Sequence, residues 1–287
     1  MVTLKLKAPW NERNGKFSPL KAVVFAALFA PAAWFLYQAA TGALAPKPVT
    51  EMIHRSGDWA LRLILLSLLV TPLRKVAQWP KLIAIRRMVG VAAFAYAFAH
   101  FCLYIVDQKF DLLHVAAEIA LRFYLTIGFV ALLGLGALAA TSTDKMIKRL
   151  GGARWNQLHK LIYGICAIAI FHFYLQSKED VSEPVMMTGF FLILMIYRAL
   201  IKRSAPLWAA IAGAAVGGTL FTALLEATWY AIRRHIDFWE VLGANIDPDM
   251  FPRPTFYVLV AGVLAMVIWA ARDLQARRAS RVLAAAE

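Results

Sequence analysis

The sequence predicts an all-α integral membrane helical bundle. Hydrophobic residues make up 61% of the 287 residues and charged residues only 17%, which is typical of membrane proteins rather than of soluble domains. The apolar residues form runs of about 20, the length at which a helix crosses a hydrocarbon core of about 30 Å. The basic residues are concentrated in alternate short connections, as expected of a chain that crosses a membrane several times.

Eight membrane spans are expected after a cytoplasmic N-terminal segment, residues 1–19. The first span is interpreted as uncleaved, because it is long enough to cross and lacks a convincing small-residue cleavage site before Pro46. The second is expected to end at Thr71-Pro72, since proline readily closes a helix. Residues 110–121 are amphipathic and are expected to lie along the outer surface. The spans fall at about 20–40, 58–73, 88–106, 122–141, 157–176, 184–201, 206–230 and 255–271.

Charge predicts the orientation of the chain. With both termini in the cytoplasm, 22 of the 31 lysines and arginines fall on the cytoplasmic side, as the positive-inside rule requires. The same rule explains the net charge of +14, so the expected partner is a lipid bilayer and not nucleic acid.

Several common motifs carry no chemistry in this chain. Cys102 and Cys166 both lie inside expected spans, so they are interpreted as packing residues rather than as a disulfide or metal site. Gly213 and Gly217 form a GxxxG pair, which favours close packing of neighbouring helices. A Rossmann fingerprint and a P-loop are lacking, so NAD(P)H is expected to act only through another protein.

Two histidines lie deep inside expected spans. By helical rise, His100 lies about 18 Å and His172 about 22 Å from the cytoplasmic edge, on parallel spans. Ionisable side chains at membrane depth are rare and usually functional, and imidazole is a good axial ligand of haem iron. The pair therefore predicts a bis-histidine, low-spin haem site suited to electron transfer. Buried histidines bonded to backbone or hydroxyl groups are the alternative.

A third candidate ligand, His159, lies about 20 Å below His172 on the same span. Span three has no histidine at that depth. It has Arg86 and Arg87 instead, which bind carboxylates or phosphates and so suit haem propionates, a flavin phosphate or a quinone oxygen. Met88 is a candidate sulfur ligand. The alternatives are an interfacial polar residue for His159 and membrane anchoring for the arginines.

Other polar residues are assigned to the outer side. Arg62 and Arg122 lie near the outer ends of spans two and four, where they either contact haem propionates or extend to the lipid headgroups. Glu226 in span seven is placed near the outer interface and has no assigned role. The remaining histidines are expected to be solvated or to cap helices: His54, His114 and His235.

Several segments in order carry a family likeness. They are His54-Arg55-Ser56-Gly57, Leu69-Val70-Thr71-Pro72-Leu73, Arg86-Arg87-Met88-Val89-Gly90 with His100, Arg122-Phe123-Tyr124-Leu125-Thr126-Ile127-Gly128, Thr141-Ser142-Thr143, and Trp155-Asn156-Gln157-Leu158-His159-Lys160-Leu161-Ile162-Tyr163 with His172. Through them the chain resembles the ferric reductase-like transmembrane family. Within that family it is similar to the haem-binding membrane subunits of bacterial periplasmic methionine sulfoxide reductase systems.

The resemblance implies a six-helix core, residues 20–203, that binds haem b in a bacterial inner membrane. It implies His100, His159 and His172 as candidate haem ligands, and FMN or a quinone as further cofactor. Electrons would come from the quinone pool or a cytoplasmic flavin reductase and would pass to MsrP, a periplasmic molybdopterin enzyme that repairs oxidised methionine. The arginine doublet stands where the wider family has its inner histidine, so the resemblance does not carry over the ligand pair of a conventional second haem. Residues 204–287, two more helices and a cytoplasmic tail, lie outside the likeness.

The expected function is therefore that of an electron-transfer subunit rather than a self-sufficient enzyme. One alternative with related chemistry is a stand-alone ferric-chelate or quinone reductase. Alternatives of other classes are a transporter or assembly factor without haem, and a structural scaffold.

Overall fold

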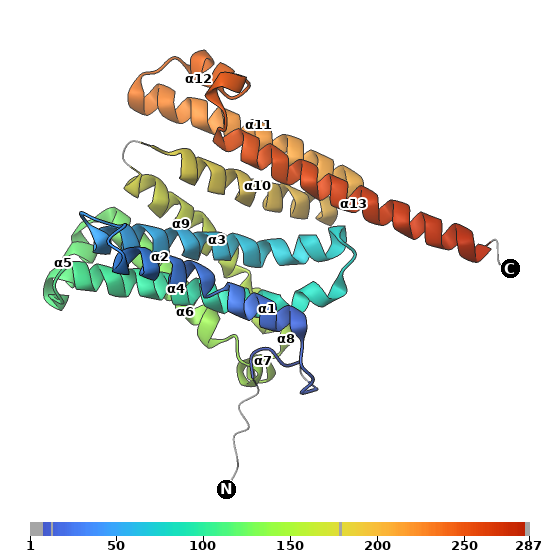
Figure 1. Ribbon diagram of the computed structural model, residues 1–287, viewed down its shortest axis with the longest axis horizontal. Coiled ribbons are helices and arrows are strands. Elements are labelled where there is room, and N and C mark those ends of the chain that lie inside the picture. Colours follow the sequence, from blue (N-terminus) through green and yellow to red (C-terminus); the bar gives the residue numbers. More distant parts are fainter. Residues whose placement is uncertain (1–7, 13, 178–179, 285–287) are drawn as a thin grey trace, which may run out of the picture. The chain divides into compact units, whose positions relative to one another are not determined.

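The computed structural model describes residues 8–12, 14–177 and 180–284, and in them the fold is helical, as the sequence predicts (Figure 1). Apart from one isolated bridge between Asn11 and Phe17, the described residues hold no paired strands. The elements are α1 (Pro19–Ala27), α2 (Ala30–Ala40), α3 (Pro48–Val76), η1 (Pro80–Ile85), α4 (Arg86–Asp107), α5 (Leu112–Leu121), α6 (Phe123–Ala140), α7 (Asp144–Leu150), α8 (Gly152–His159), α9 (Leu161–Gln176), α10 (Ser182–Lys202), α11 (Leu207–Arg234), α12 (Phe238–Ala244), η2 (Pro248–Met250) and α13 (Pro254–Ala284).

Seven helical segments of the described chain, rather than the eight expected, are long and apolar enough to cross a membrane. The segment that differs is 58–73, which lies inside the 29-residue helix α3 and is not among the seven. Asp58 and Arg62 are the charged residues of this segment, and α3 at about 1.5 Å per residue is long enough to cross a hydrocarbon core. The seven are Pro19–Ala40, Pro80–Asp107, Phe123–Ala140, Gly152–Gln176, Ser182–Lys202, Leu207–Arg234 and Pro254–Val282.

The first span is not continuous but breaks between α1 and α2. The hydroxyl of Tyr96, on α4, donates to the Leu28 carbonyl at 2.8 Å and accepts from the Ala32 N–H at 3.1 Å. In an unbroken helix these two backbone groups would bond to each other, so the hydroxyl is inserted into the hydrogen-bond ladder. The break is thereby satisfied by a side chain from a neighbouring helix.

The expectation that a helix ends at Thr71-Pro72 is wrong, because α3 continues through Pro72 to Val76. Pro72 has no N–H to give to the carbonyl of Leu68, four residues earlier. A guanidinium nitrogen of Arg198, on α10, donates to that carbonyl at 2.5 Å instead. The arginine supplies the hydrogen bond that the proline removes, which lets the helix continue.

This arrangement predicts a coupled pair of substitutions. Arg198→Met leaves the Leu68 carbonyl without its donor and is expected to lower the free energy of unfolding in detergent by about 1–3 kcal/mol. In a Pro72→Ala background the new backbone N–H at this position can bond to the Leu68 carbonyl, so the same Arg198→Met change is expected to cost clearly less. Equal costs in the two backgrounds, measured by denaturant unfolding, would show that the arginine does not replace the missing helical bond.

The chain divides into two compact units. One contains Met1–Ser67 and Ala84–His172, and the other contains Leu68–Ile83 and Phe173–Glu287. The first unit holds all three candidate haem ligands. The expected boundary between residues 203 and 204 follows the family likeness rather than the packing, and it stays a prediction.

In the second unit, α10, α11 and α13 run side by side (Figure 1). The close packing expected of Gly213 and Gly217 is present. A Cβ on Gly213 would lie 2.8 Å from a methyl of Leu200, and one on Gly217 would lie 3.2 Å from a methyl of Ile196, both on α10. Glycine at these positions therefore lets α11 approach α10 closely.

A buried ion pair joins α11 to the segment before α13. Glu226 is 0% exposed, and its Oε1 accepts from a guanidinium nitrogen of Arg253 at 2.8 Å. Its second oxygen, Oε2, is buried without a hydrogen-bond partner. The sequence predicts only that Glu226 lies near the outer interface. In the structure its carboxylate is wholly enclosed by protein and paired with Arg253.

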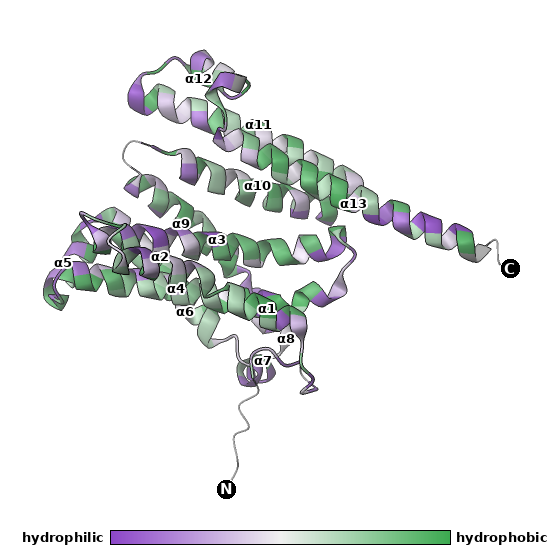
Figure 2. Ribbon diagram, in the orientation of Figure 1, coloured by the Kyte–Doolittle hydropathy of each residue, from purple (hydrophilic) through white to green (hydrophobic). Residues whose placement is uncertain are grey.

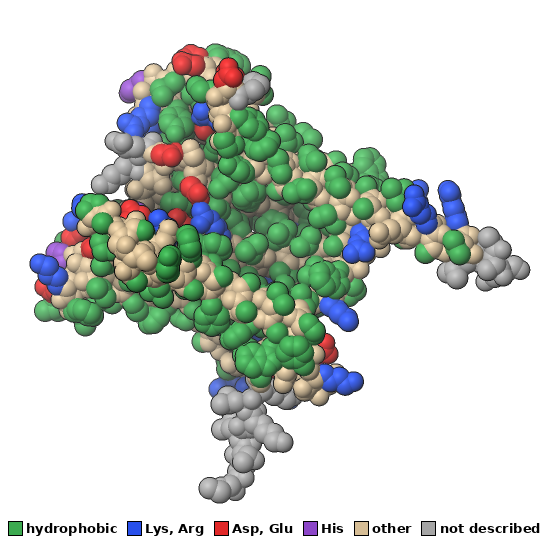
Figure 3. Space-filling view, viewed as in Figure 1, with side chains coloured by type: hydrophobic (Ala, Val, Ile, Leu, Met, Phe, Trp, Pro, Cys, Tyr) green, Lys and Arg blue, Asp and Glu red, His purple; other side chains and the backbone are tan. Residues whose placement is uncertain are grey.

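The last helix is longer than the expected span, which stops at residue 271. α13 continues to Ala284, and its final turns are polar and carry basic side chains (Figures 2 and 3). Arg277 pairs with Asp273 one turn away at 2.6 Å. The expected C-terminal tail is therefore helical through residue 284.

Candidate functional site

The two deep histidines meet inside the first unit. His100 on α4 and His172 on α9 have ring centres 6.5 Å apart, with their planes at 86°. Two imidazoles on opposite sides of one metal ion, each at a metal–nitrogen distance of about 2 Å, have ring centres about 6 Å apart. The observed separation therefore fits two axial ligands of one iron.

Each imidazole is held at Nδ1 by a backbone carbonyl. His100 Nδ1 lies 2.7 Å from the carbonyl oxygen of Ile53 on α3, and His172 Nδ1 lies 2.8 Å from that of Tyr124 on α6. Since a carbonyl only accepts, Nδ1 carries the proton in both rings, and the lone pair of the neutral ring is on Nε2. This is the tautomer and the support that a metal-bound histidine requires.

A glycine lies four residues after each carbonyl. A Cβ on Gly57 would be 3.0 Å from His100 Nδ1, and a Cβ on Gly128 would be 2.8 Å from both Nδ1 and Cε1 of His172. On a helix, positions i and i+4 share a face. The same local design therefore receives both imidazoles: a carbonyl that accepts from Nδ1 and, one turn later, a glycine that leaves room for the ring.

Sequence reasoning missed these four residues as parts of the site. Gly57 and Gly128 belong to the segments that carry the family likeness, but no role was assigned to them. The signal in the sequence was a glycine in each of the segments that pack against the two histidines, Gly57 and Gly128. The carbonyl partners could not be predicted, because each lies 47 or 48 residues from its histidine.

The glycines give a testable prediction. Gly128→Ala is expected to displace the His172 ring and to lower haem content per purified chain by about tenfold, the lower range for loss of a supporting group. Gly57→Ala is expected to have a smaller effect, because its contacts with His100 are longer. Haem is quantified by extraction and absorbance.

Gly164→Ala is the matched control, because it lies on the same helix as His172 and a Cβ there meets no atom within 4 Å. Equal haem content in the Gly128 and Gly164 variants would contradict the proposed fit around His172.

The third histidine has different surroundings. His159, at the end of α8, lies with Nε2 3.3 Å from the Thr141 hydroxyl, and its ring stacks on Trp155 with centres 3.9 Å apart. Trp155 in turn donates from Nε1 to the Thr141 carbonyl at 2.9 Å. The structure thus joins two of the sequence segments quoted above into one cluster. His159 as a haem ligand stays a prediction.

The arginine doublet divides between two environments. Arg86 lies close enough to His159 to interact with it electrostatically. Arg87 pairs with Asp144 at the start of α7, at 2.5 Å. Met88 lines a groove along α4, which Arg87 lines as well. These positions do not form a second pair of ligands like His100 and His172.

Arg122 and Arg62, which the sequence assigns to the outer side, also have local partners. Arg122 pairs with Glu118 at 2.5 Å and donates to the Tyr124 hydroxyl at 3.4 Å. The Tyr124 hydrogen bond, and then the Glu118 carboxylate, raise the pKa of Arg122. Its partner Tyr124 is the residue whose carbonyl holds His172. Arg62 lies over the ring of Trp59, 5.5 Å from its centre. The remaining histidines are exposed: His54, His114 and His235.

Comparison with protein families places residues 56–170 in the ferric reductase like transmembrane component. The matched range includes His100 and His159 and ends two residues before His172. No solved structure is significantly similar to the chain.

Curated relatives are similar over more of the chain. The match with a protein of Caulobacter vibrioides is 36% identical over 177 residues, 61% of this chain and 84% of the relative. A protein of Xanthomonas oryzae is 40% identical over 192 residues, which are 64% of this chain and 88% of the relative. A protein of Agrobacterium fabrum is 43% identical over 169 residues, which are 58% of this chain and 78% of the relative. Each relative is named as the haem-binding subunit MsrQ of a protein-methionine-sulfoxide reductase.

Proposed function

Because the chain belongs to the MsrQ family of ferric reductase-like membrane proteins, we propose that it is a b-type haem subunit that transfers electrons across the bacterial inner membrane. The observation that carries the proposal is the pair of imidazoles, His100 and His172, at a separation that suits one iron. Haem, when bound, supplies reversible one-electron redox chemistry at that position.

The chain's own residues hold and orient this group. His100 and His172 would hold the haem iron through Nε2, and the carbonyls of Ile53 and Tyr124 fix the tautomer of both rings. A haem held by both imidazoles would supply electron transfer rather than substrate chemistry at the iron. Arg62 and Arg122 are proposed to contact the haem propionates.

The donor is proposed to act from the inner side, as a quinol or a cytoplasmic flavin reductase. Arg86 and His159, which interact electrostatically, would offer a cation and an imidazole to an anionic or carbonyl group there, including FMN. Arg87 can contribute only in competition with Asp144. His159 is the proposed ligand of any second haem. This assignment uses the orientation with both termini in the cytoplasm, which requires an even number of crossings and therefore counts the 29-residue helix α3 as the eighth.

The acceptor is proposed to be MsrP, on the periplasmic side. The test uses the haem-loaded chain in liposomes, reduced anaerobically, with MsrP and an oxidised methionine substrate outside. The proposal predicts rapid reoxidation of the haem spectrum that requires both MsrP and its substrate.

Other outcomes identify the alternatives. Equal reoxidation by a ferric chelate or a quinone without MsrP would support a stand-alone reductase. A colourless protein that takes up no haem would contradict the electron-transfer proposal and favour a transporter or assembly factor.

A further inference from the structure

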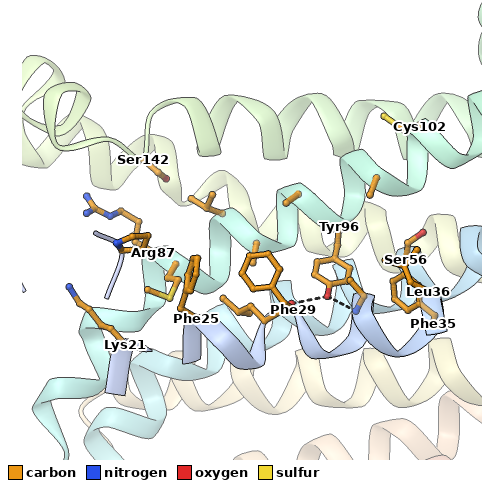
Figure 4. A pocket seen from close by; sticks show the side chains of 18 of the residues that line it. Lys21, Phe25, Phe29, Phe35, Leu36, Ser56, Arg87, Tyr96, Cys102 and Ser142 are labelled. Carbon is orange, nitrogen blue, oxygen red and sulfur yellow. Dashed lines mark hydrogen bonds between the residues drawn. The ribbon is translucent and has the colours of Figure 1, made fainter. Parts of the chain in front are cut away.

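A large apolar groove lies in the first unit, apart from the histidine pair. It has a volume of about 930 Å³ and separates α1 and α2 from α3 and α4 (Figure 4). Pockets of about 300–1,000 Å³ usually hold ligands the size of a drug molecule. Of the residues in α1 and α2, only Phe35 is fully buried, so the first span stands away from the helices behind it.

The groove follows one face of α4. Small side chains at Ala92, Ala95 and Ala99 form its floor, while Phe25 and Phe29 of the first span form the opposite wall. Tyr96 stands midway, where its hydroxyl crosses the groove to Leu28 and Ala32 (Figure 4). The groove therefore has two halves, one on each side of this tyrosine.

One half of the groove ends at charged side chains. Lys21 and Arg87 lie at this mouth with the hydroxyls of Ser142 and Thr143 and the carboxylate of Asp144 (Figure 4). Arg87 pairs with Asp144, and Lys21 Nζ donates to the Asn11 carbonyl at 2.8 Å. Two cations face one carboxylate, so the mouth is positive overall. The far half, beyond Tyr96, is lined by Ser56, Cys102 and apolar residues.

The length of the charged half suits one leaflet of a bilayer. From Arg87 to Tyr96 the axis of α4 rises about 14 Å, close to half of a hydrocarbon core of about 30 Å. A molecule with an anionic head at the mouth and an apolar chain along the alanine floor would fill this half.

We propose that the half-groove between Lys21, Arg87 and Tyr96 binds one anionic phospholipid, with its phosphate at the two cations and an acyl chain against Ala92 and Ala95. Basic pockets between membrane helices commonly bind anionic lipid headgroups. None of these residues is a proposed ligand of the haem iron, and Arg87 alone among them is also a candidate contact for the electron donor. The lipid secures the first span, which otherwise contacts the bundle weakly.

The test uses the purified full-length protein in nanodiscs that contain spin-labelled phosphatidylglycerol or spin-labelled phosphatidylcholine. The wild type is expected to immobilise about one phosphatidylglycerol per chain in preference to phosphatidylcholine. Ala95→Leu fills the floor and is expected to abolish this immobilised component. Lys21→Gln with Arg87→Gln is expected to reduce the preference for phosphatidylglycerol, by about fivefold for each cation removed.

Matched controls keep the experiment specific. Ala137→Leu changes an exposed alanine of α6 outside the groove, and Lys81→Gln removes an exposed cation outside it; both are expected to behave as wild type. Equal immobilisation in wild type and Ala95→Leu would overturn the site. A loss of preference in the Lys81 control as large as in the Lys21 and Arg87 variant would overturn the assigned headgroup contacts. Recovery of a stoichiometric prenylated quinone that resists phosphatidylglycerol would overturn the choice of occupant.

Discussion

Replacing His172 or His100 with alanine is expected to lower the haem content of the purified protein by about a hundredfold or more per chain. Either change leaves the iron with one axial imidazole and opens a buried space beside Gly128 or Gly57. The loss is expected to exceed that of a supporting residue, which usually costs tenfold to a hundredfold in metal affinity. Haem is measured per chain by extraction, with protein folding followed by circular dichroism.

His114→Ala is the control for histidine loss in general, because His114 is exposed at the start of α5. His159→Ala separates the proposed sites, since a chain with one haem between His100 and His172 retains it. Full haem content in the His100 and His172 variants would remove the basis of the ligand assignment.

The second large effect is expected at the buried ion pair. Arg253→Met leaves the wholly buried Glu226 carboxylate without its cation and is expected to lower the free energy of unfolding by about 3–5 kcal/mol. Replacing both partners, with Glu226→Gln and Arg253→Met, is expected to restore most of that stability, because no unpaired charge remains. The free energy of unfolding is measured by denaturant titration in detergent for Arg253→Met, for the double variant and for Glu226→Gln alone.

A double variant that is at least as unstable as the sum of the two single variants would contradict this account. The pair would then not be coupled, and Arg253 would stabilise the protein in another way. The Asp273 and Arg277 pair is an exposed comparison, at which breaking the pair is expected to cost less than about 1 kcal/mol.

Hydropathy and length were sufficient to predict the helical membrane class and seven of the spans. They failed to predict where helices break or continue, because those features depend on contacts across the fold. The helix through Pro72 depends on Arg198, and the break after Leu28 depends on the Tyr96 hydroxyl. Neither partner is adjacent in sequence, so local pattern could not reveal them.

The candidate site could likewise be predicted only in part from the sequence. Counting helical rise placed His100 and His172 at similar depth, and the structure brings their rings together. The carbonyls that hold Nδ1 and the glycines that admit the rings come from α3 and α6, which sequence spacing alone does not align with α4 and α9. The groove beside α4 was missed because its small floor residues resemble ordinary alanine in a membrane helix.

The most direct test of the haem assignment is the electron paramagnetic resonance spectrum of the oxidised, haem-loaded protein. Two axial imidazoles with planes at 86° predict a low-spin ferric signal of the strongly anisotropic type that near-perpendicular ligand planes produce. That signal is expected in wild type and in His159→Ala, and to be absent in His100→Ala and His172→Ala. A high-spin signal in wild type, or a low-spin signal that survives both of the latter changes, would contradict the pairing of His100 with His172 at one iron.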